Sequence, residues 1–531
     1  MGAATAVLAL LLAGCGGSAS DGASSDGADD GPAPTGSDDA ARCEDGSGGE
    51  LTMGVFSETA VVDPVKTTQG VFGAMPVLAV YDALMTFDQE TRTWEPRLAE
   101  SLEPNDDLTE WTLTLRPDVT FGNGNPLDAE AVKASVERHQ DPDVGSLSGR
   151  VVSQITGIEV ADDLTVVFTL QNPNGAFPSV LAAETGMIVD VSAIEEAGEA
   201  FGTVPSGAGA GPFEIESQAP GEELVLTAKD DYWGGEVCLD SVRFVAIPGS
   251  QPTYESFGLG ELDVAFLREP SVVTQAEDDG VANFTNLRLG GDVIFINNAA
   301  TEAHLDDVRV RQAIIQAIDE EAIDERAFRG DGIPTRAIAD PSSLLYDGVD
   351  GTPLDPESAE GLLADVKEET GWDGKLKLQC QTVPDKVEVG IAVKAQLDAV
   401  GFDVEIEQGL GVNDWVRKVN VDRDYELACG GSISIDQAHP ATNLETYRSD
   451  NVLNYLNWTS ESYDGLLADL RAATDADGQA PALAAIQELW NEEAPALVYN
   501  NVDEMIVWSD EVAGLDFTIN TMVFLDQATK G

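Results

Sequence analysis

The chain has 531 residues and a formal net charge of −68, because 96 aspartate and glutamate residues outnumber 28 lysine and arginine residues. This balance makes nucleic acid a poor partner, since phosphate binding needs clustered lysine and arginine. The acidity favours a well-solvated surface that aids solubility. A preference for cationic solutes and a salty habitat are the alternative explanations.

The N-terminus resembles a signal peptide. Residues 3–13 are an unbroken run of small and apolar residues, which continues into Leu12-Ala13-Gly14-Cys15. The run has the length of a signal-peptide core and is too short to span a bilayer as a helix. Leu-Ala-Gly-Cys is similar to a bacterial lipobox. The sequence therefore predicts removal of residues 1–14 and attachment of a lipid to Cys15.

Residues 15–42 are predicted to be a flexible tether. After Cys15 this segment consists largely of glycine, serine, alanine and aspartate, without aromatic residues or apolar periodicity. Such a composition cannot bury enough surface to offset the entropy of ordering. The lipid and the tether would hold a folded body close to a membrane surface. No later stretch approaches eighteen consecutive apolar residues, so no transmembrane helix is predicted.

Residues 43–531 are too many for one core and should divide into two or three. In the first half, residues 111–116 (Trp-Thr-Leu-Thr-Leu-Arg) alternate apolar and polar side chains, as a half-buried strand does. Residues 123–126 form an Asn-Gly-Asn-Pro turn. Asp128 is predicted to cap a helix that runs through Val132.

A second region, residues 375–430, predicts a parallel α/β arrangement. Apolar residues recur there on one face of a helix, which Gly401 ends: Val389, Val393, Leu397 and Val400. Residues 403–406 and 425–429 then predict two strands. Alternating strands and helices indicate the α/β class.

Four cysteines remain after Cys15: Cys43, Cys238, Cys380 and Cys429. An even number in an exported chain predicts two disulfides, and the sequence alone allows three pairings. There is no Cys-x-x-Cys motif and no cluster of cysteine and histidine, so no metal site is predicted.

Several motifs together resemble those of the extracytoplasmic solute-binding proteins of the peptide, dipeptide and nickel class, family 5. Individually they are short, but they follow in the family's order over most of the chain. They are Pro96–Leu102, Leu113–Arg116, Val119–Phe121, Pro126–Val132, Gly209–Phe213, Asp231–Gly235, Gly260–Asp263, Asp307–Ala313, Ala317–Asp319 and Glu493–Leu497.

The resemblance implies a type II-like periplasmic binding protein fold, with two ligand-closing lobes and an extra small domain. Carried over by position, lobe I is residues 43–80, 205–289 and 497–531. Lobe II, the extra domain, is residues 81–204, and lobe III is residues 290–496. Lobe I then contains Cys43 and Cys238, and lobe III contains Cys380 and Cys429. This division favours these two pairs as the disulfides.

The resemblance also implies the function of a lipid-anchored receptor of an ABC importer on the outer face of the cell membrane. The protein would be a monomer without a cofactor. It would capture a peptide-like or related small solute and deliver it to a permease with its ATPases. Opines, oligosaccharides and chelated metals remain open as solutes. The alternative is a surface adhesion or signalling receptor that keeps the fold without transport.

Peptide binders of this family hold the ligand's ammonium group with an aspartate that lies shortly before a proline. Here Asp436 and Pro440 have this spacing, so Asp436 is the candidate anchor. A turn or helix-capping aspartate is the alternative. Trp415 is a candidate for an aromatic contact with the solute, or else a core residue. The backbone of two segments could pair with an extended peptide, or form ordinary loops: Thr68, Gln69 and Gly70, and Ser432, Ile433 and Ser434.

Enzyme motifs are missing from the sequence. It contains no Gly-x-Ser-x-Gly, no His-Glu-x-x-His, no P-loop and no Gly-x-Gly-x-x-Gly that opens a helix. Its three histidines, His139, His304 and His439, are scattered. His439 lies near Asp436, but a single histidine makes a poor transition-metal site. The sequence therefore predicts a binding protein and no enzyme.

Overall fold

The computed structural model describes residues 43, 48–67, 73–88, 91–407, 409–431, 440–451, 454–518 and 520–531. Residues 41–531 form one compact unit. The predicted signal peptide, the lipidation site Cys15 and the tether lie outside the described residues. The names lobe I, lobe II and lobe III are kept below for the residue ranges given above, and the division itself stays a prediction.

One mixed sheet of eleven strands runs through lobes I and III. In lobe I, a central strand pairs in parallel with one strand on each side, and an antiparallel pair extends one edge. These strands are β1 (Glu50–Val55) between β10 (Ser241–Ala246) and β11 (Val264–Leu267), followed by β9 (Glu223–Ala228) and β8 (Phe213–Ala219). The helices of this part are α1 (Met75–Tyr81), α6 (Ser250–Gly258) and α7 (Pro270–Asp278).

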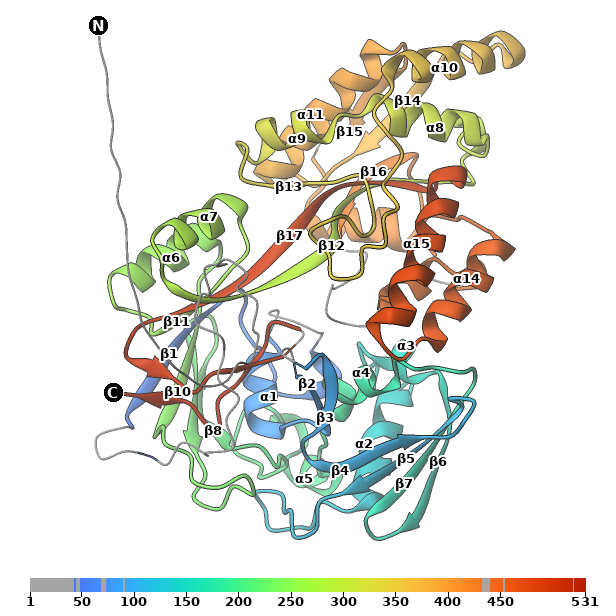
Figure 1. The fold of residues 1–531 in the computed structure, drawn as a ribbon. Helices are drawn as coiled ribbons and strands as arrows, with labels where there is room; N and C mark the ends of the chain where they lie inside the picture. The colour runs from blue at the N-terminus through green and yellow to red at the C-terminus, as the bar shows by residue number, and fades with distance from the viewer. Residues whose placement is uncertain are drawn as a thin grey trace, which may run out of the picture. The chain divides into compact units, whose positions relative to one another are not determined.

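Two long antiparallel strands, β12 (Ala282–Ile296) and β17 (Ala496–Trp508), connect the two halves of the sheet (Figure 1). Their register shifts between Arg288 and Asp292, next to the predicted boundary between lobes I and III. Gly290 has a φ of 54°, which favours glycine. A Cβ on Gly291 would lie 2.5 Å from the Val502 side chain, so the two strands approach closely here. The irregularity makes this crossing the candidate hinge.

In lobe III, three strands continue the sheet beyond β12 in the order β16 (Leu427–Gly431), β14 (Lys375–Gln379) and β15 (Asp403–Glu407). The last two pairings are parallel. Helix α11 (Pro384–Ala399) lies between β14 and β15 in the chain. The predicted parallel α/β region is therefore confirmed, although the strand predicted at 425–429 begins two residues later.

Alternating residues of β12 pack on opposite faces of the sheet, because successive side chains of a strand point to opposite sides. Ile294 and Ile296 belong to one buried cluster, with α8 (Val308–Ala317), α9 (Glu320–Ala327), α10 (Pro356–Thr370) and α11. Val293 and Phe295 belong to a second cluster, with α12 (Val412–Val416), α13 (Ala441–Leu444), α14 (Glu461–Ala472) and α15 (Ala476–Glu493). Both faces of the lobe III sheet are therefore buried.

Lobe II contains a four-stranded antiparallel sheet in the order β4-β5-β7-β6. Its strands are β4 (Ala99–Pro104), β5 (Glu110–Leu115), β7 (Thr165–Leu170) and β6 (Ile155–Asp162). Trp111, Leu113 and Leu115 are buried, so the alternation predicted for residues 111–116 is confirmed. Asp128 caps α2 (Ala129–Gln140) through a hydrogen bond from the backbone N of Ala131, which confirms the predicted helix start.

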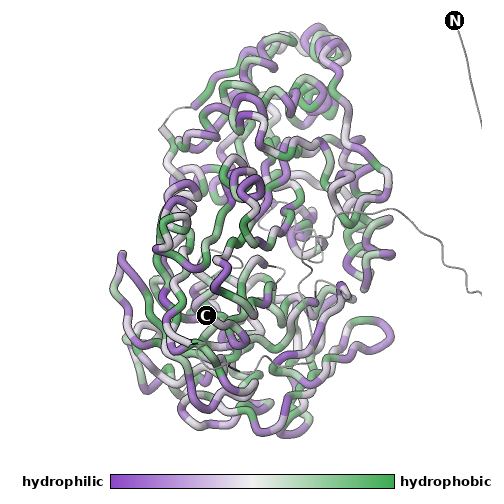
Figure 2. Tube along the Cα trace, turned by 60° about the vertical axis from the view of Figure 1, so that its left-hand side comes forward, coloured by the Kyte–Doolittle hydropathy of each residue, from purple (hydrophilic) through white to green (hydrophobic). Residues whose placement is uncertain are grey.

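The remaining elements are short. The helices are α3 (Gly149–Val152), α4 (Phe177–Leu181) and α5 (Val191–Ala197), the 3₁₀ turns η1 (Pro64–Lys66), η2 (Glu184–Gly186), η3 (Gly198–Ala200), η4 (Thr301–Ala303) and η6 (Glu445–Tyr447), and the π-helix η5 (Arg417–Val421). The strands are β2 (Met85–Asp88), β3 (Thr93–Pro96), β13 (Ile333–Pro334), β18 (Val512–Ala513), β19 (Asp516–Phe517), β20 (Val523–Phe524) and β21 (Thr529–Lys530). Hydrophilic and hydrophobic residues are interspersed along much of the chain, as expected where an element has one exposed face (Figure 2).

Two disulfides join Cys43 to Cys238 and Cys380 to Cys429, the pairs that the lobe assignment favours. Their Cα atoms are 5.3 Å and 4.8 Å apart, within the usual range for disulfides. The first bond attaches the start of the folded body to lobe I. The second joins the residue after β14 to the middle of the neighbouring strand β16 in lobe III.

A buried polar cluster explains two of the sequence motifs. The carboxylate of Asp82 is fully buried and accepts hydrogen bonds from Arg97 Nε and, at 2.7 Å, from the Tyr232 hydroxyl. Trp233 Nε1 donates to the same carboxylate at 3.2 Å. Arg97 Nη2 also donates to Asp526 at 2.8 Å. These motif residues hold the C-terminal segment against the junction of lobes I and II.

Candidate functional site

The segment that contains the candidate anchor joins β16 to α13. Asp436 and the segment Ser432–Ser434 lie outside the described residues, but both flanks are placed. Gly431, the last residue of β16, pairs with Asp292 of β12. Pro440 directly precedes α13. The last described residue before this segment, Gly431, therefore lies beside β12.

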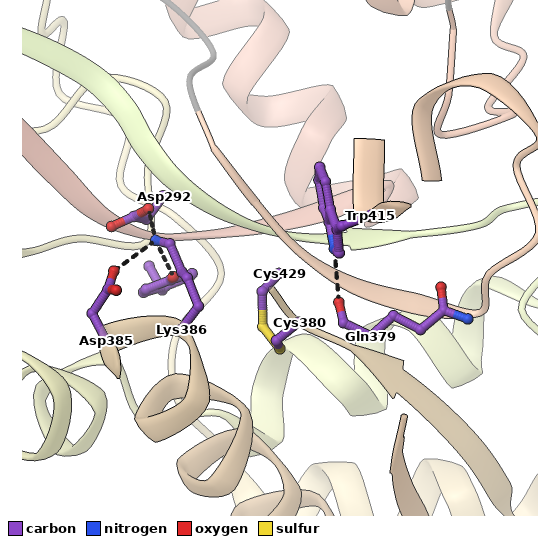
Figure 3. The surroundings of a disulfide bond; sticks show 8 residues. Asp292, Gln379, Cys380, Asp385, Lys386, Trp415 and Cys429 are labelled. Atoms are coloured by element: carbon purple, nitrogen blue, oxygen red, sulfur yellow. Dashed lines mark hydrogen bonds and ion pairs between the residues drawn. A yellow bond between two sulfur atoms is a disulfide. The ribbon is translucent and has the colours of Figure 1, made fainter. Parts of the chain in front are cut away.

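The strands β14 and β16 run parallel and both end at this edge of the lobe III sheet. In open α/β sheets, ligands bind outside the carboxyl ends of the parallel strands. The Cys380–Cys429 disulfide joins the residue that directly follows β14 to the middle of β16, two residues before that strand ends (Figure 3). It thereby fastens the two strands to each other near this edge.

A buried ion cluster lies near the disulfide, where α11 begins (Figure 3). Lys386 Nζ is paired with the Asp292 carboxylate and lies 3.7 Å from the Asp385 carboxylate and 3.4 Å from the Tyr499 hydroxyl. Burial acts to lower the pKa of the Lys386 ammonium, but the neighbouring groups, Asp292 first, outweigh it and raise that pKa. Asn500 Nδ2 donates to the second oxygen of Asp292 at 3.2 Å. The cluster links α11 to both hinge strands.

Side-chain amides lie at the candidate hinge. Asn500 Oδ1 accepts a hydrogen bond from the backbone N of Ile333, and Asn501 Oδ1 accepts one from the backbone N of Gly290, both at 2.8 Å. Asn501 Nδ2 donates to Asp340 at 2.9 Å. The Asn501 amide satisfies the N–H of Gly290, which the irregular β12 leaves without a ladder partner, and the Asn500 amide satisfies the N–H of Ile333 in β13. Sequence reasoning missed them, although two adjacent asparagines inside the otherwise apolar run 496–502 were a usable signal.

Trp415 is buried, with 4% of its surface exposed. Its Nε1 donates to the backbone oxygen of Gln379 at 3.1 Å, and its ring centroid lies 6.4 Å from that of Phe295 (Figure 3). These are the contacts of a core side chain, which was the alternative interpretation. Its direct contact with a solute stays a prediction.

On the lobe I side, Thr68, Gln69 and Gly70 lie outside the described residues. The turn η1 directly precedes Thr67 and these residues. Asp63 caps it through a hydrogen bond from Val65 N. The Asp63 carboxylate also accepts hydrogen bonds from both terminal nitrogens of Arg138 in α2, at 2.7 Å and 2.6 Å. This bidentate pair ties lobe I to lobe II.

A pocket of about 290 Å³ lies between lobe II and lobe III. Sequence reasoning did not find it, because its walls come from segments almost 300 residues apart. The lobe II wall includes Gln154, Asn172 and Ala176, and the lobe III wall includes Ala441, Thr442, Glu445, Arg448 and Arg471. The lobe III wall begins one residue after Pro440, at the end of the segment that carries Asp436.

Among the described residues, no group of three or more histidine, cysteine, aspartate or glutamate side chains is arranged to hold a metal ion. Within the same residues, no helix combines the length and the apolar character needed to cross a membrane.

The comparisons with known proteins agree with the fold. The model of bacterial extracellular solute-binding proteins, family 5, matches residues 93–454. The dipeptide-binding protein of Escherichia coli strain K12 is 24% identical over 468 residues, which cover 82% of this chain and 86% of that protein.

Two solved structures illustrate the structural match. One is the ABC transporter-associated periplasmic binding protein DppA from Helicobacter pylori, in complex with the peptide STSA. It superposes with a TM-score of 0.74 at 21% identity, over 91% of this chain and 98% of that one. The other is the binding protein AgaA from A. tumefaciens R10, in complex with agropinic acid. Its TM-score is 0.73 at 24% identity, over 91% and 99% of the two chains.

These matches establish a periplasmic binding protein fold of the α/β class. The family model covers more than half of the chain, including most of lobe II, the hinge strand β12 and the carboxyl ends of β14 and β16. The chain belongs to the bacterial extracellular solute-binding proteins of family 5.

Proposed function

We propose that this protein is the receptor of an ABC importer and binds a peptide-like solute by closure of lobe I on lobe III. The observation that carries the proposal is the family match over residues 93–454. A dipeptide-binding relative and a structural neighbour with a bound peptide support the peptide class. The neighbour with bound agropinic acid makes an opine the second class to test.

The hinge supports a mechanism by closure. The two lobes share β12 and β17, and the irregular crossing at Arg288–Asp292 is where these strands can bend. A solute that touches both lobes stabilises the closed arrangement and shifts the equilibrium towards it. A membrane permease with its ATPases would then recognise the closed receptor. The receptor acts as a monomer in this proposal, held to the outer face of the membrane by the lipid on Cys15.

Replacing Cys15 with alanine should abolish lipidation, because only the cysteine thiol can carry the lipid. The variant should then appear in the medium, while the wild type stays with the membrane fraction. Metabolic labelling with a fatty acid, followed by fractionation, measures both effects. Ser18→Ala, in the same tether, is the matched control and should behave as the wild type. A Cys15→Ala protein that still sediments with washed membranes would refute the anchor.

Replacing Asp436 with asparagine tests the proposed anchor for an ammonium group. The change keeps the shape of the side chain but removes the charge that compensates a buried cation. The affinity should fall by about 2 kcal/mol or more, as for other desolvated charge pairs that lose one partner. Calorimetric titration is done with the solute that co-purifies with the wild type, once mass spectrometry has identified it.

The outcome separates a binding residue from a structural one. A turn aspartate would change the thermal stability by about 1 kcal/mol or less and leave the affinity nearly unchanged. Asp469→Asn, an exposed aspartate of α14, is the matched control. Equal affinities of wild type and Asp436→Asn would remove Asp436 from the site and with it the main argument for an amine-bearing solute.

A further inference from the structure

Lobe II and lobe III are joined by a pair of hydrogen bonds at the end of α14. The backbone N of Gly175 donates to the backbone oxygen of Arg471 at 2.8 Å. Arg471 Nε donates in return to the backbone oxygen of Pro173 at 2.9 Å. We call residues 173–175 and 471–473, with these two bonds, the clasp. It lies apart from β12 and β17, the strands that connect lobe III to lobe I (Figure 1).

Each side of the clasp is held in place by its own lobe. In lobe II, the buried Asn174 side chain accepts a hydrogen bond from the backbone N of Ala176 at 2.9 Å, and its backbone N donates to the oxygen of Leu108 at 3.0 Å. In lobe III, Glu445 Oε2 lies 3.4 Å from Arg471 Nη1 and orients the guanidinium group. Each surface is thus set by contacts within its own lobe.

Gly175 lets the two lobes approach closely. A Cβ at this position would lie 2.7 Å from the backbone oxygen of Ala473 and 3.0 Å from Thr474 Cγ2, and its three nearest neighbours all belong to lobe III. Gly175 does not have a positive φ, so the backbone of lobe II accepts a side chain at this position without strain. A methyl group on residue 175 would therefore disturb the contact with lobe III and leave lobe II itself intact.

Lobe II is fastened to lobe I and would move with it. The Asp63–Arg138 ion pair across their junction is shielded, with only 4% and 15% of its two side chains exposed. A backbone hydrogen bond from Val62 N to the Gly202 oxygen, at 2.8 Å, joins the same two lobes. Bending of β12 and β17 would thus move lobe III against lobes I and II together. In such a motion the clasp forms as the cleft closes and breaks as it opens.

We propose that the clasp raises the affinity for the solute by stabilising the closed receptor, and not by contact with the solute. The proposal rests on the proposed function, because it requires that the solute is bound by closure. Gly175 and Arg471 are then positioning residues, and the solute has to supply only part of the free energy of closure.

The described flanks of the segment that carries Asp436 support this coupling. One flank, Gly431, pairs with the hinge strand β12. The other flank, Pro440, directly precedes α13, whose first residue lines the same pocket as Arg471 of the clasp. The candidate solute segment therefore begins at the hinge and ends near the clasp.

Gly175→Ala in the full-length protein tests the clasp, because glycine has no side chain whose loss could remove a solute contact. Closure is measured as the distance between two spin labels, on cysteines that replace the exposed Glu159 of lobe II and Glu488 of lobe III. With a pool of random tripeptides present, the distances in Gly175→Ala should shift to longer values than in the wild type. The amount of tripeptide retained after gel filtration should fall about tenfold, since a backbone hydrogen bond and one from a charged donor are both weakened.

Gly465→Ala is the matched control. It adds the same methyl group to α14, at an exposed position where a Cβ would meet nothing within 4 Å, and should equal the wild type in label distance and in retained peptide. Arg471→Met removes the side-chain bond to Pro173 from the lobe III side. It should shift the distances in the same direction as Gly175→Ala, which keeps the test decisive if one of the two variants folds poorly.

Two results would overturn the clasp as a determinant of affinity while the peptide receptor stands. One is a wild-type distance distribution in both clasp variants, and the other is a shift to longer distances without any loss of retained tripeptide. If the wild type itself retains no tripeptide, the proposed peptide receptor is overturned. The label distances measured without peptide then decide whether the clasp holds the receptor closed: a shift in the clasp variants supports it, and equal distances refute it.

Discussion

Replacing Lys386 with methionine should destabilise the protein by about 3 to 5 kcal/mol, the usual cost of removing one partner from a buried ion pair. Only 16% of the Lys386 side chain and 10% of the Asp292 side chain are exposed. Without the ammonium, the Asp292 carboxylate keeps one hydrogen bond from a side chain that the structure describes, that of Asn500. The free energy of unfolding, measured by urea denaturation at neutral pH with intact disulfides, gives the size of the effect.

A double-mutant cycle with Asp292→Asn sharpens this prediction. The double variant Lys386→Met/Asp292→Asn leaves no unpaired charge, so it should cost much less than the sum of the two single changes. Lys375→Met is the matched control, since the Lys375–Asp373 pair is largely exposed and should contribute about 0.5 kcal/mol or less. A loss of stability for Lys386→Met no larger than that of the control would show that the pair does not brace the hinge.

The second large effect concerns Glu184, which lies at the junction of lobes I and II. Its side chain is buried, and its Oε1 accepts no hydrogen bond from any described residue. Desolvation raises the pKa of this carboxyl to about 8. In the unfolded chain the same carboxyl titrates near 4.5. Between these two values the native protein holds a proton that the unfolded chain has already lost.

Stability should therefore fall as the pH rises from about 4.5 to 8, by at most about 1.4 kcal/mol per pH unit. Glu184→Gln carries no titratable group at this position and should lose this contribution to the slope, while the contribution of Asp503, whose pKa burial raises to about 6, stays in both proteins. At pH 8 the variant should be more stable than the wild type by about 4 kcal/mol, and near pH 4.5 the two should be nearly equal. Urea denaturation at several pH values between 4.5 and 9 measures both curves.

His139 gives the opposite slope and does not disturb the comparison. Burial lowers the pKa of its imidazole to about 4, so its contribution is complete above 6.5 and is lost as the pH falls towards 4. The wild type and Glu184→Gln should both show this loss of stability at low pH, because both contain His139. Glu199→Gln, an exposed glutamate nearby in the chain, is the control and should follow the wild type throughout. A Glu184→Gln curve parallel to that of the wild type above pH 5 would contradict a neutral, buried Glu184.

Local patterns predicted those parts of the fold that depend on near neighbours. The strand around Trp111 and Leu113 and the helix capped by Asp128 are specified by alternation and by a hydrogen bond across three residues. The parallel region around β14, α11 and β15 was also predicted, because its apolar residues keep helical or strand spacing. The family motifs supplied the order of the larger parts and the favoured cysteine pairs.

The polar centres of the molecule could not be predicted in the same way. Asp292 meets Asn500 across 208 residues, and Arg471 meets Pro173 across 298 residues. Local sequence patterns do not predict contacts between residues so far apart in the chain, because each partner resembles an ordinary surface residue within its own segment. Trp415 shows the opposite difficulty. Its position suggested a solute contact, while its burial against Phe295 is decided by tertiary packing.

The position of β17 in the sheet has a consequence for the way this protein reaches its folded state. This strand comes from the end of the chain, yet it lies between β11 and β12, at the centre of the sheet. Residues after it, such as Met522 and Phe524, complete the buried cluster of lobe I. An exported chain emerges with its N-terminus first, so β11 and β12 gain their shared partner β17 only near the end of export. The sheet therefore cannot be completed until nearly the whole polypeptide has left the cytoplasm, and the chain stays loosely folded while it is exported.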